Sequence, residues 1–257
     1  PEEIVKEKEI GEVHFLVSFD GKEYKKEGVE IRLEDFYGKM VAESNVFPLT
    51  AAPSPNDYYE VFKEKAKEGK DILCICISTK LSSSMQSAEI AAKMLAEKYP
   101  DIQVKIIDSL ACTLMQGLYV LEACRLRDLG YTLKDSIERM NQLTDTQRIF
   151  FTVGNLEYLE HGGRIGKVAS IAGKLLNVKP LITLKDGEIY SPGLKRGRKK
   201  SMAGTIDLLL DYMEENGYTP ENCSLVIGYC YGYEEAESAL LHLAKLHHII
   251  KIYFYND

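Results

Sequence analysis

Two short apolar runs, each followed by an amphipathic helical pattern, constrain the fold of this chain more than any other feature. The runs DILCICIS (71–78) and VKIIDS (104–109) have the length and composition of buried parallel strands. The helical patterns that follow them cover residues 84–99 and 113–130, and a further helix is predicted over 133–143. This β-α-β-α order predicts a doubly wound α/β domain, whose ligands bind where strands end and helices begin.

The pattern changes near residue 147, where we place a boundary between a first domain (1–147) and a second domain (148–257). In the second domain, Asp186-Gly187 is a turn dipeptide that predicts a β-hairpin. An α+β domain with a mixed sheet follows from the other predicted elements, which are strands at 148–154, 224–232 and 249–255 and helices at about 199–216 and 234–247.

Composition and charge exclude several classes of protein. The chain has 257 residues with a net charge of −7, which argues against nucleic acid as the main partner. It contains neither an apolar run long enough to span a membrane nor a secretory signal, so we expect a cytoplasmic protein without stable membrane insertion. The first residue is Pro rather than Met, and we expect the natural start to be missing.

The six cysteines do not follow the spacing of a metal site. Cys74 and Cys76 fall on one face of an apolar strand, the other four are scattered singly, and no CxxC pair occurs. We therefore predict reduced thiols, no bound metal and no cofactor.

Five hydroxyl side chains separate the strand at 71–78 from the helix at 84–99. One hydroxyl is enough to cap a helix, so the surplus indicates an oxygen-rich ligand such as a carboxylate or a phosphate. The alternative is a capping box with solvated serines. The five residues are Ser78, Thr79, Ser82, Ser83 and Ser84.

Two other strand ends carry polar residues. In FPLTAAPSPNDYYEVF (47–62), Thr50 ends a short extended piece, while Pro53 and Pro55 are expected to force a turn and start a helix. Thr50 is a candidate ligand group by the same reasoning, or else a loop residue that makes a local turn. For Asp108, which ends a strand, we expect the carboxylate to cap the following helix.

The stretch EHGGRIGKVASIAGKLL (160–176) combines a constrained turn with an apolar stripe. Gly162-Gly163 permits unusual backbone angles, and Arg164 projects from that turn. Such a stripe usually packs in a core, but it also suits the wall of a pocket for a long apolar tail. Its residues are Ile165, Val168, Ile171, Ala172, Leu175 and Leu176.

The segment KRGRKK (195–200) holds five basic residues in six. We expect an exposed loop, either simply solvated or recruiting an anionic partner, and we assign Arg196 and Arg198 to partner binding. Catalytic signatures are missing: the sequence has no G-x-S-x-G elbow, no recognisable histidine triad, no Walker A loop and no GxGxxG.

Several motifs together resemble the DegV family of bacterial fatty-acid-binding proteins. They occur in the family's order and spacing over nearly the whole chain, and the block LEYL-x-x-GGRI…LLN-x-KP is highly specific. The motifs are LTAAPS (49–54), ISTKLSSSMQSA (77–88), IIDS (106–109), NLEYLEHGGRI (155–165), LLNVKPLI (175–182) and KRGRKK.

The resemblance implies two α/β-type domains with one acyl chain buried between them. It implies that Thr50 and Ser82 match the hydroxyls that hold the fatty-acid carboxylate, and that a separate fatty acid kinase phosphorylates it. Two positions depart from the family pattern: Ala51 replaces a Ser, and Ser83 replaces a Gly but can contribute its own hydroxyl. The family's opening strand and its closing segment with a carboxylate-binding His are expected outside this sequence.

The sequence thus predicts a non-covalent carrier of a long-chain fatty acid that performs no chemistry alone. Thr50, Ser82, Ser83 and Arg164 are its predicted ligand residues. One alternative is a serine hydrolase or acyltransferase that uses Ser82, which would need a general base within reach. Another is a binder of a phosphorylated metabolite, with Arg164 and residues 195–200 as the anion site.

Overall fold

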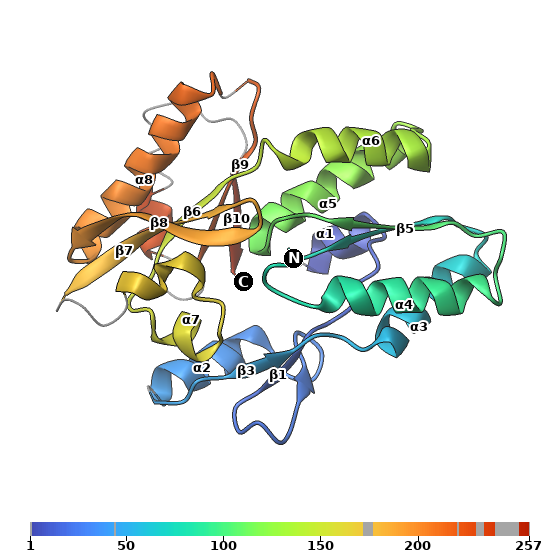
Figure 1. Cartoon of the computed structure of the whole chain (residues 1–257), viewed down its shortest axis with the longest axis horizontal. Helices are drawn as coiled ribbons and strands as arrows, with labels where there is room; N and C mark the ends of the chain where they lie inside the picture. The colour runs from blue at the N-terminus through green and yellow to red at the C-terminus, as the bar shows by residue number, and fades with distance from the viewer. Residues whose placement is uncertain are drawn as a thin grey trace. The chain divides into compact units, whose positions relative to one another are not determined.

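A computed structural model describes residues 2–43, 45–171, 177–219, 221–229, 234–239 and 252–256, with the backbone alone for 170–171 and 252–256. The chain divides into two compact units. The first unit comprises residues 1–112 and 119–146, and the second comprises residues 113–118 and 147–257. Figure 1 labels their helices and strands.

The first unit begins with a small antiparallel sheet. Its central strand β1 (Leu16–Ser18) pairs with β2 (Lys25–Lys26) and with β3 (Leu49–Ala51). Two helices belong to the same part of the chain, α1 (Glu2–Glu7) and α2 (Leu33–Ala42). Thr50 is the central residue of β3 and pairs with Val17, so β1 fixes the register of this candidate residue.

The predicted β-α-β-α order follows and confirms the α/β fold class. Strand β4 (Ile72–Cys76) pairs in parallel with β5 (Val104–Asp108), and α4 (Ser84–Ala96) connects them. Parallel neighbours require such a crossover connection. The remaining helices around this pair are α3 (Pro55–Lys67), α5 (Thr113–Asp128) and α6 (Leu133–Thr144).

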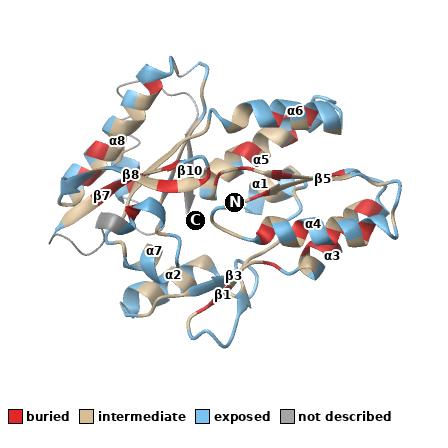
Figure 2. Ribbon diagram, viewed as in Figure 1, coloured by how far each residue is buried: buried red, intermediate tan, exposed pale blue. Residues whose placement is uncertain are grey.

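The core of the first unit contains one face of α4. Ala88, Ala91 and Leu95 are completely buried at helical spacing, so one face of α4 is apolar and closely packed. Against it pack the buried side chains of Tyr58 and Phe62 from α3. Figure 2 shows buried positions on both α3 and α4. Burying side chains of this size stabilises the fold by about 1.5–3 kcal/mol each. The packing therefore holds α4 against α3.

The second unit contains a three-stranded antiparallel sheet and a parallel strand pair. The sheet has the order β6 (Ile149–Thr152), β7 (Val178–Lys185) and β8 (Glu188–Arg196), and α8 (Arg198–Glu215) follows it. The predicted hairpin is confirmed at Asp186-Gly187, where both residues have positive φ. The remaining elements are α7 (Glu157–His161), a 3₁₀ helix (Gly166–Ile171), and β9 (Leu225–Tyr229), which pairs in parallel with β10 (Ile252–Asn256).

The expectation that KRGRKK forms an exposed loop is wrong. Lys195 and Arg196 are the last residues of β8, and Arg198 is the first residue of α8. Gly197 lies between the two elements with a φ of +80°, a conformation that strains residues with a Cβ. The basic residues are therefore held by a strand–helix junction rather than by a loop.

The apolar stripe of residues 165–176 is described in part. Val168 is completely buried, in a 3₁₀ helix rather than an α-helix. The stripe residues Ala172, Leu175 and Leu176, and most of the helix predicted at 234–247, lie outside the described residues. Among the helices in the described ranges, none is both long enough and apolar enough to cross a membrane.

Candidate functional site

The segment from the end of β4 to the first residue of α4, residues 77–84, carries the five hydroxyl groups and is called the hydroxyl loop below. Ser78 and Ser84 are buried, Ser82 is half-buried, and Thr79 and Ser83 are exposed. The loop lies at the carboxyl end of β4 and at the N-terminus of α4, which is the position that the sequence predicts for a ligand site.

Backbone hydrogen bonds fold the hydroxyl loop into a compact turn. Ser78 N–H donates to the Ala111 carbonyl at 2.8 Å, which ties the loop to the segment after β5. The N–H groups of Leu81 and Ser82 both donate to the Ser78 carbonyl, at 2.9 and 3.1 Å. Ser82 is therefore held one tight turn away from the end of β4.

The Ser82 hydroxyl has a geometry suited to an anionic ligand. Its oxygen accepts a hydrogen bond from Ser84 N–H at 3.1 Å, which satisfies one free donor at the start of α4. Since a hydroxyl has one proton of its own, Ser82 can still donate it to a carboxylate or phosphate oxygen. Ser83 occupies the N-cap position without a side-chain capping bond. Capping and ligand binding are thus compatible at Ser82.

The interpretation of Asp108 as a cap of the following helix is wrong. Its carboxylate accepts from Thr79 N–H and from the Thr79 hydroxyl, with a distance of 2.5 Å between Oγ1 and Oδ2. It also accepts from Leu110 N–H at 2.9 Å. The N-cap of α5 is Cys112, which has no side-chain capping bond. Asp108 points back to the hydroxyl loop because Cys76 and Asp108 are register partners in the parallel pair.

Thr50 lies in the same unit but in the other sheet. It is exposed on β3, four residues before the N-cap of α3. The predicted turn and helix start are confirmed, because Pro55 is the first residue of α3 and Ser54 forms a capping box with Asp57. Lys26 of β2 pairs with Asp57 at 3.0 Å and joins α3 to the small sheet.

Arg164 belongs to the second unit, just after α7. Its side chain is exposed, and one guanidinium N–H donates to the Gly162 carbonyl. Gly163 has a φ of +71°, as the predicted constrained turn requires. Gly166 also has positive φ, and a Cβ there would lie 2.8 Å from the Ile189 carbonyl oxygen. This motif therefore brings backbone close to β8 and fixes the turn that carries Arg164.

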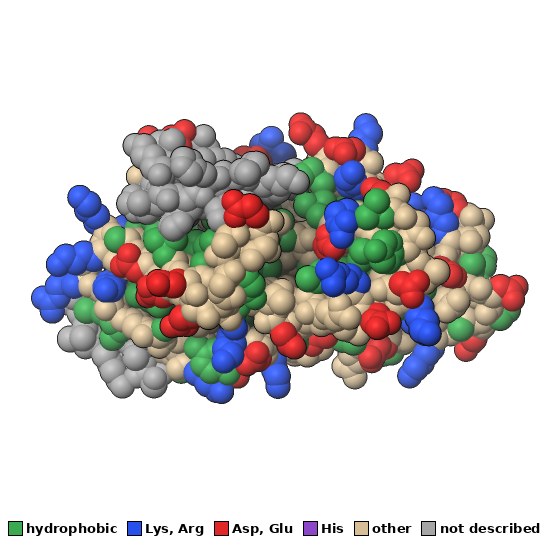
Figure 3. All heavy atoms as spheres, turned by 90° about the horizontal axis from the view of Figure 1, so that it is seen from above, with side chains coloured by type: hydrophobic (Ala, Val, Ile, Leu, Met, Phe, Trp, Pro, Cys, Tyr) green, Lys and Arg blue, Asp and Glu red, His purple; other side chains and the backbone are tan. Residues whose placement is uncertain are grey.

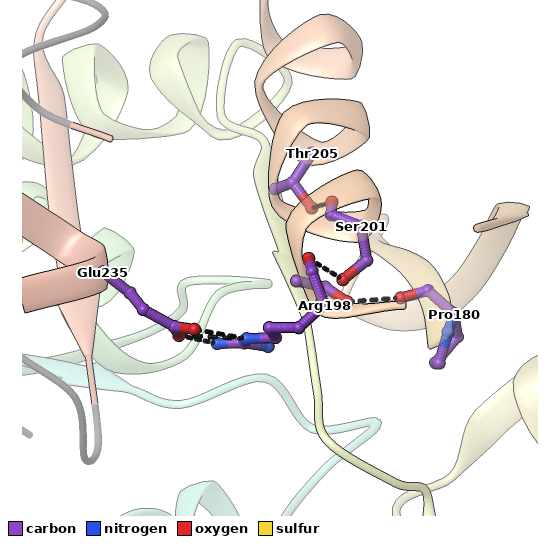
Figure 4. A network of polar contacts seen from close by, with 6 residues as sticks. Pro180, Arg198, Ser201, Thr205 and Glu235 are labelled. Carbon is purple, nitrogen blue, oxygen red and sulfur yellow. Dashed lines mark hydrogen bonds and ion pairs between the residues drawn. The ribbon is translucent and has the colours of Figure 1, made fainter. Parts of the chain in front are cut away.

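The basic junction divides into an exposed residue and a paired residue. Arg196 is exposed at the end of β8. Arg198 binds the carboxylate of Glu235 at 2.6 and 2.9 Å through two guanidinium nitrogens (Figure 4). The same view shows Ser201 donating to the Arg198 carbonyl, which secures the first turn of α8. The Arg198 guanidinium holds the pKa of Glu235 below its ordinary value.

Two thiols lie on β4, the strand that precedes the hydroxyl loop, as the strand pattern predicts. The sulfur atoms of Cys74 and Cys76 are 3.8 Å apart on one face of β4. The neighbouring Cys74 thiol lowers the pKa of Cys76, and burial raises the pKa of Tyr58 beside them. Within the described ranges, no three His, Cys, Asp or Glu side chains form a group that could hold a metal ion.

Sequence reasoning missed the contact between Thr79 and Asp108. Both residues follow a predicted parallel strand, and strand ends of this kind meet at one sheet edge. That signal was present, but the register of the pair decides which side chains meet.

The surface agrees with the argument from net charge against nucleic acid as the main partner. In the face shown in Figure 3, acidic and basic side chains are interspersed over the first unit.

Comparison with known proteins identifies the family. Residues 1–254 match the family model described as uncharacterised proteins of the DegV family. The fold is similar to a fatty acid (stearic acid)-binding protein from Eubacterium ventriosum, with a TM-score of 0.91, 35% identity, and coverage of 95% of this chain and 83% of that one.

Two further proteins are similar. A DegV family protein from Thermus thermophilus, whose solved structure concerns fatty acid binding, has a TM-score of 0.85 and 27% identity, with coverage of 100% of this chain and 88% of that one. A DegV domain-containing protein from Caldanaerobacter subterraneus is 34% identical over 84% of this chain and 74% of its own length. With a family match over nearly its whole length, the chain belongs to the DegV family.

Proposed function

We propose that this protein binds one long-chain fatty acid non-covalently and presents its carboxylate to a separate fatty acid kinase. The acyl chain would lie between the domains 1–147 and 148–257, with Thr50, Ser82, Ser83 and Arg164 near the carboxylate. The observation that carries the proposal is the Ser82 hydroxyl, which stands at the start of α4 with its own proton left to donate. The stearic acid of the Eubacterium ventriosum protein supports this class of ligand.

The chemistry of the hydroxyl loop suits a carboxylate. The N-terminus of α4 carries a partial positive charge, and serine hydroxyls add donors without a counter-charge. Burial of the acyl chain contributes about 0.8 kcal/mol per methylene, so a long chain supplies most of the affinity. The polar site then fixes which end of the ligand faces the kinase.

The kinase partner rests on family membership and on the basic junction. Arg196 is exposed at the end of β8, where its charge remains available to an acidic or phosphate-bearing surface. A cytoplasmic site of action fits a partner that uses a nucleotide. A hydrolase function of Ser82 has less support, because among the described residues the Ser82 hydroxyl bonds to a backbone N–H of α4 rather than to a general base.

Native mass spectrometry of the protein purified from cells tests the proposal. We expect a mass increase equal to one long-chain fatty acid, which is lost after delipidation and regained on adding palmitic acid. Delipidated protein that fails to take up palmitic acid at any concentration would contradict the proposal. A co-purified phosphate ester would instead favour a binder of a phosphorylated metabolite.

A further inference from the structure

Asp108 connects the hydroxyl loop to the segment that follows β5. Its carboxylate accepts three kinds of donor: the Thr79 backbone N–H, the Thr79 hydroxyl and the Leu110 N–H. Thr79 is in the hydroxyl loop and Leu110 follows β5, so one carboxylate joins two segments that are far apart in the sequence. Charged acceptors make stronger and shorter hydrogen bonds than neutral ones.

The contact is supported from both strands. Cys76 and Asp108 are register partners, so the two strand ends lie side by side. Ser109, completely buried, donates its N–H and its hydroxyl to the Cys76 carbonyl at 3.1 and 2.7 Å. The Ser78 N–H completes the connection to Ala111. The end of β4 therefore cannot shift relative to β5 without breaking several hydrogen bonds.

The backbone after Asp108 is in an unusual conformation. Leu110 has a φ of +50°, in the left-handed region that disfavours side chains with a Cβ. Its N–H donates one of the hydrogen bonds that the Asp108 carboxylate accepts. Conformations of this kind persist where surrounding contacts determine them, and they often accompany functional sites.

We propose that Asp108 is a positioning residue for the hydroxyl loop, where the carboxylate of the fatty acid would bind. Through Thr79 it fixes the hydroxyl loop, and the loop's turn from the Ser78 carbonyl to Ser82 N–H sets the place of the Ser82 hydroxyl. Preorganised donors bind an anion without the cost of ordering the loop at the moment of binding. This inference rests on the proposed function, since the ligand is the carboxylate of a fatty acid.

Matched ligands separate positioning from general stability. Palmitic acid and methyl palmitate share the same tail, but only the acid carries a charged carboxylate. Equilibrium dialysis with both radiolabelled ligands gives the ratio of their Kd values for each protein. A loss of fold or of the tail site weakens both ligands, whereas a misplaced hydroxyl loop weakens the acid alone.

Three variants test the two partners. Thr79→Val keeps the shape and charge of the site but removes the hydroxyl, and Thr79→Ser restores it. Asp108→Asn removes the carboxylate charge. We expect Thr79→Val and Asp108→Asn to lower the preference for the acid by about 10- to 150-fold, the range for a hydrogen bond to a charged group, and Thr79→Ser to stay within about 2-fold of wild type.

The outcomes are distinct. If Thr79→Val keeps the wild-type ratio, the positioning role is overturned while the proposed function stands. If Asp108→Asn binds the acid more tightly and Thr79→Val is unchanged, Asp108 acts by charge repulsion, which also overturns it. If wild type binds neither ligand, the proposed function itself fails. Where Asp108→Asn melts before the assay temperature, the Thr79→Val and Thr79→Ser pair decides.

Discussion

The Arg198 guanidinium binds the Glu235 carboxylate with two of its nitrogens, which joins the first turn of α8 to the helical residues 234–239. Both side chains remain partly exposed, with 40% and 45% of their surface accessible. An exposed pair of this kind contributes about 0–1 kcal/mol to stability. The Arg198 charge is thus paired within the second unit, whereas Arg196 is exposed at the end of β8, so Arg196 is the better candidate for contact with a partner.

We predict that Arg196→Ala slows kinase-dependent phosphorylation of the bound fatty acid and leaves fatty-acid affinity within a few-fold of wild type. The reason is that exposed charges steer association rather than hold a buried ligand. A coupled phosphorylation assay measures the first effect, and its wild-type rate should fall as salt screens the charges. Arg139→Ala, which removes an exposed charge from α6, is the matched control. Equal rates in both variants would remove Arg196 from the partner surface.

We predict that Thr50→Ala and Ser82→Ala each weaken fatty-acid binding by about 1–3 kcal/mol, the cost of losing a hydrogen bond to a charged group. Titration of delipidated protein with a fluorescent fatty acid measures the effect. Ser87→Ala removes a hydroxyl from the first turn of α4, three residues after the loop, and serves as control. A variant that binds like this control would exclude its residue from the carboxylate site.

We predict that the purified protein forms no acyl-serine at Ser82. The Ser82 oxygen accepts from a backbone N–H, and a nucleophilic serine requires a base that removes its proton. Intact mass after incubation with an activated acyl ester measures adduct formation, and Ser82→Ala is the control. An adduct on wild type that is absent from Ser82→Ala would support the hydrolase alternative.

We predict that Ser54→Ala destabilises the protein by about 0.5–2 kcal/mol, because it removes the side-chain cap of α3. Denaturant unfolding of the delipidated protein measures the difference. Ser83→Ala is a matched control, since the N-cap of α4 makes no side-chain capping bond, and it should change stability by less than about 0.5 kcal/mol. Equal losses in the two variants would contradict the role of the cap.

The same cap gives a pH dependence. The hydrogen bond from the Ser54 hydroxyl, aided by Lys26, holds the pKa of Asp57 below its ordinary value. A carboxylate with a lowered pKa contributes stability that is full above its unfolded pKa and is lost as pH falls through its folded pKa. The stability difference between wild type and Asp57→Asn should therefore be constant near neutral pH and shrink below about pH 4. A difference that grows in acid would contradict this assignment.

Sequence alone determined the elements and the family. Alternating buried strands and amphipathic helices are local patterns, so the βαβ unit of β4, α4 and β5 and the hairpin at Asp186-Gly187 could be predicted from residue spacing. The place of Ser82 at a strand–helix junction followed from the same local order. Motif resemblance named the family because its Gly-rich block is specific to it.

Tertiary structure decided which side chains meet. The register between β4 and β5 sets Asp108 against Thr79, and no local pattern encodes a contact across 29 residues. Likewise, the pairing of Arg198 with Glu235 depends on where α8 packs. The run of basic residues that resembles a solvated loop in the sequence forms a strand–helix junction in the structure. Local propensity fixes the elements, whereas register and packing are set by long-range contacts that form only in the folded chain.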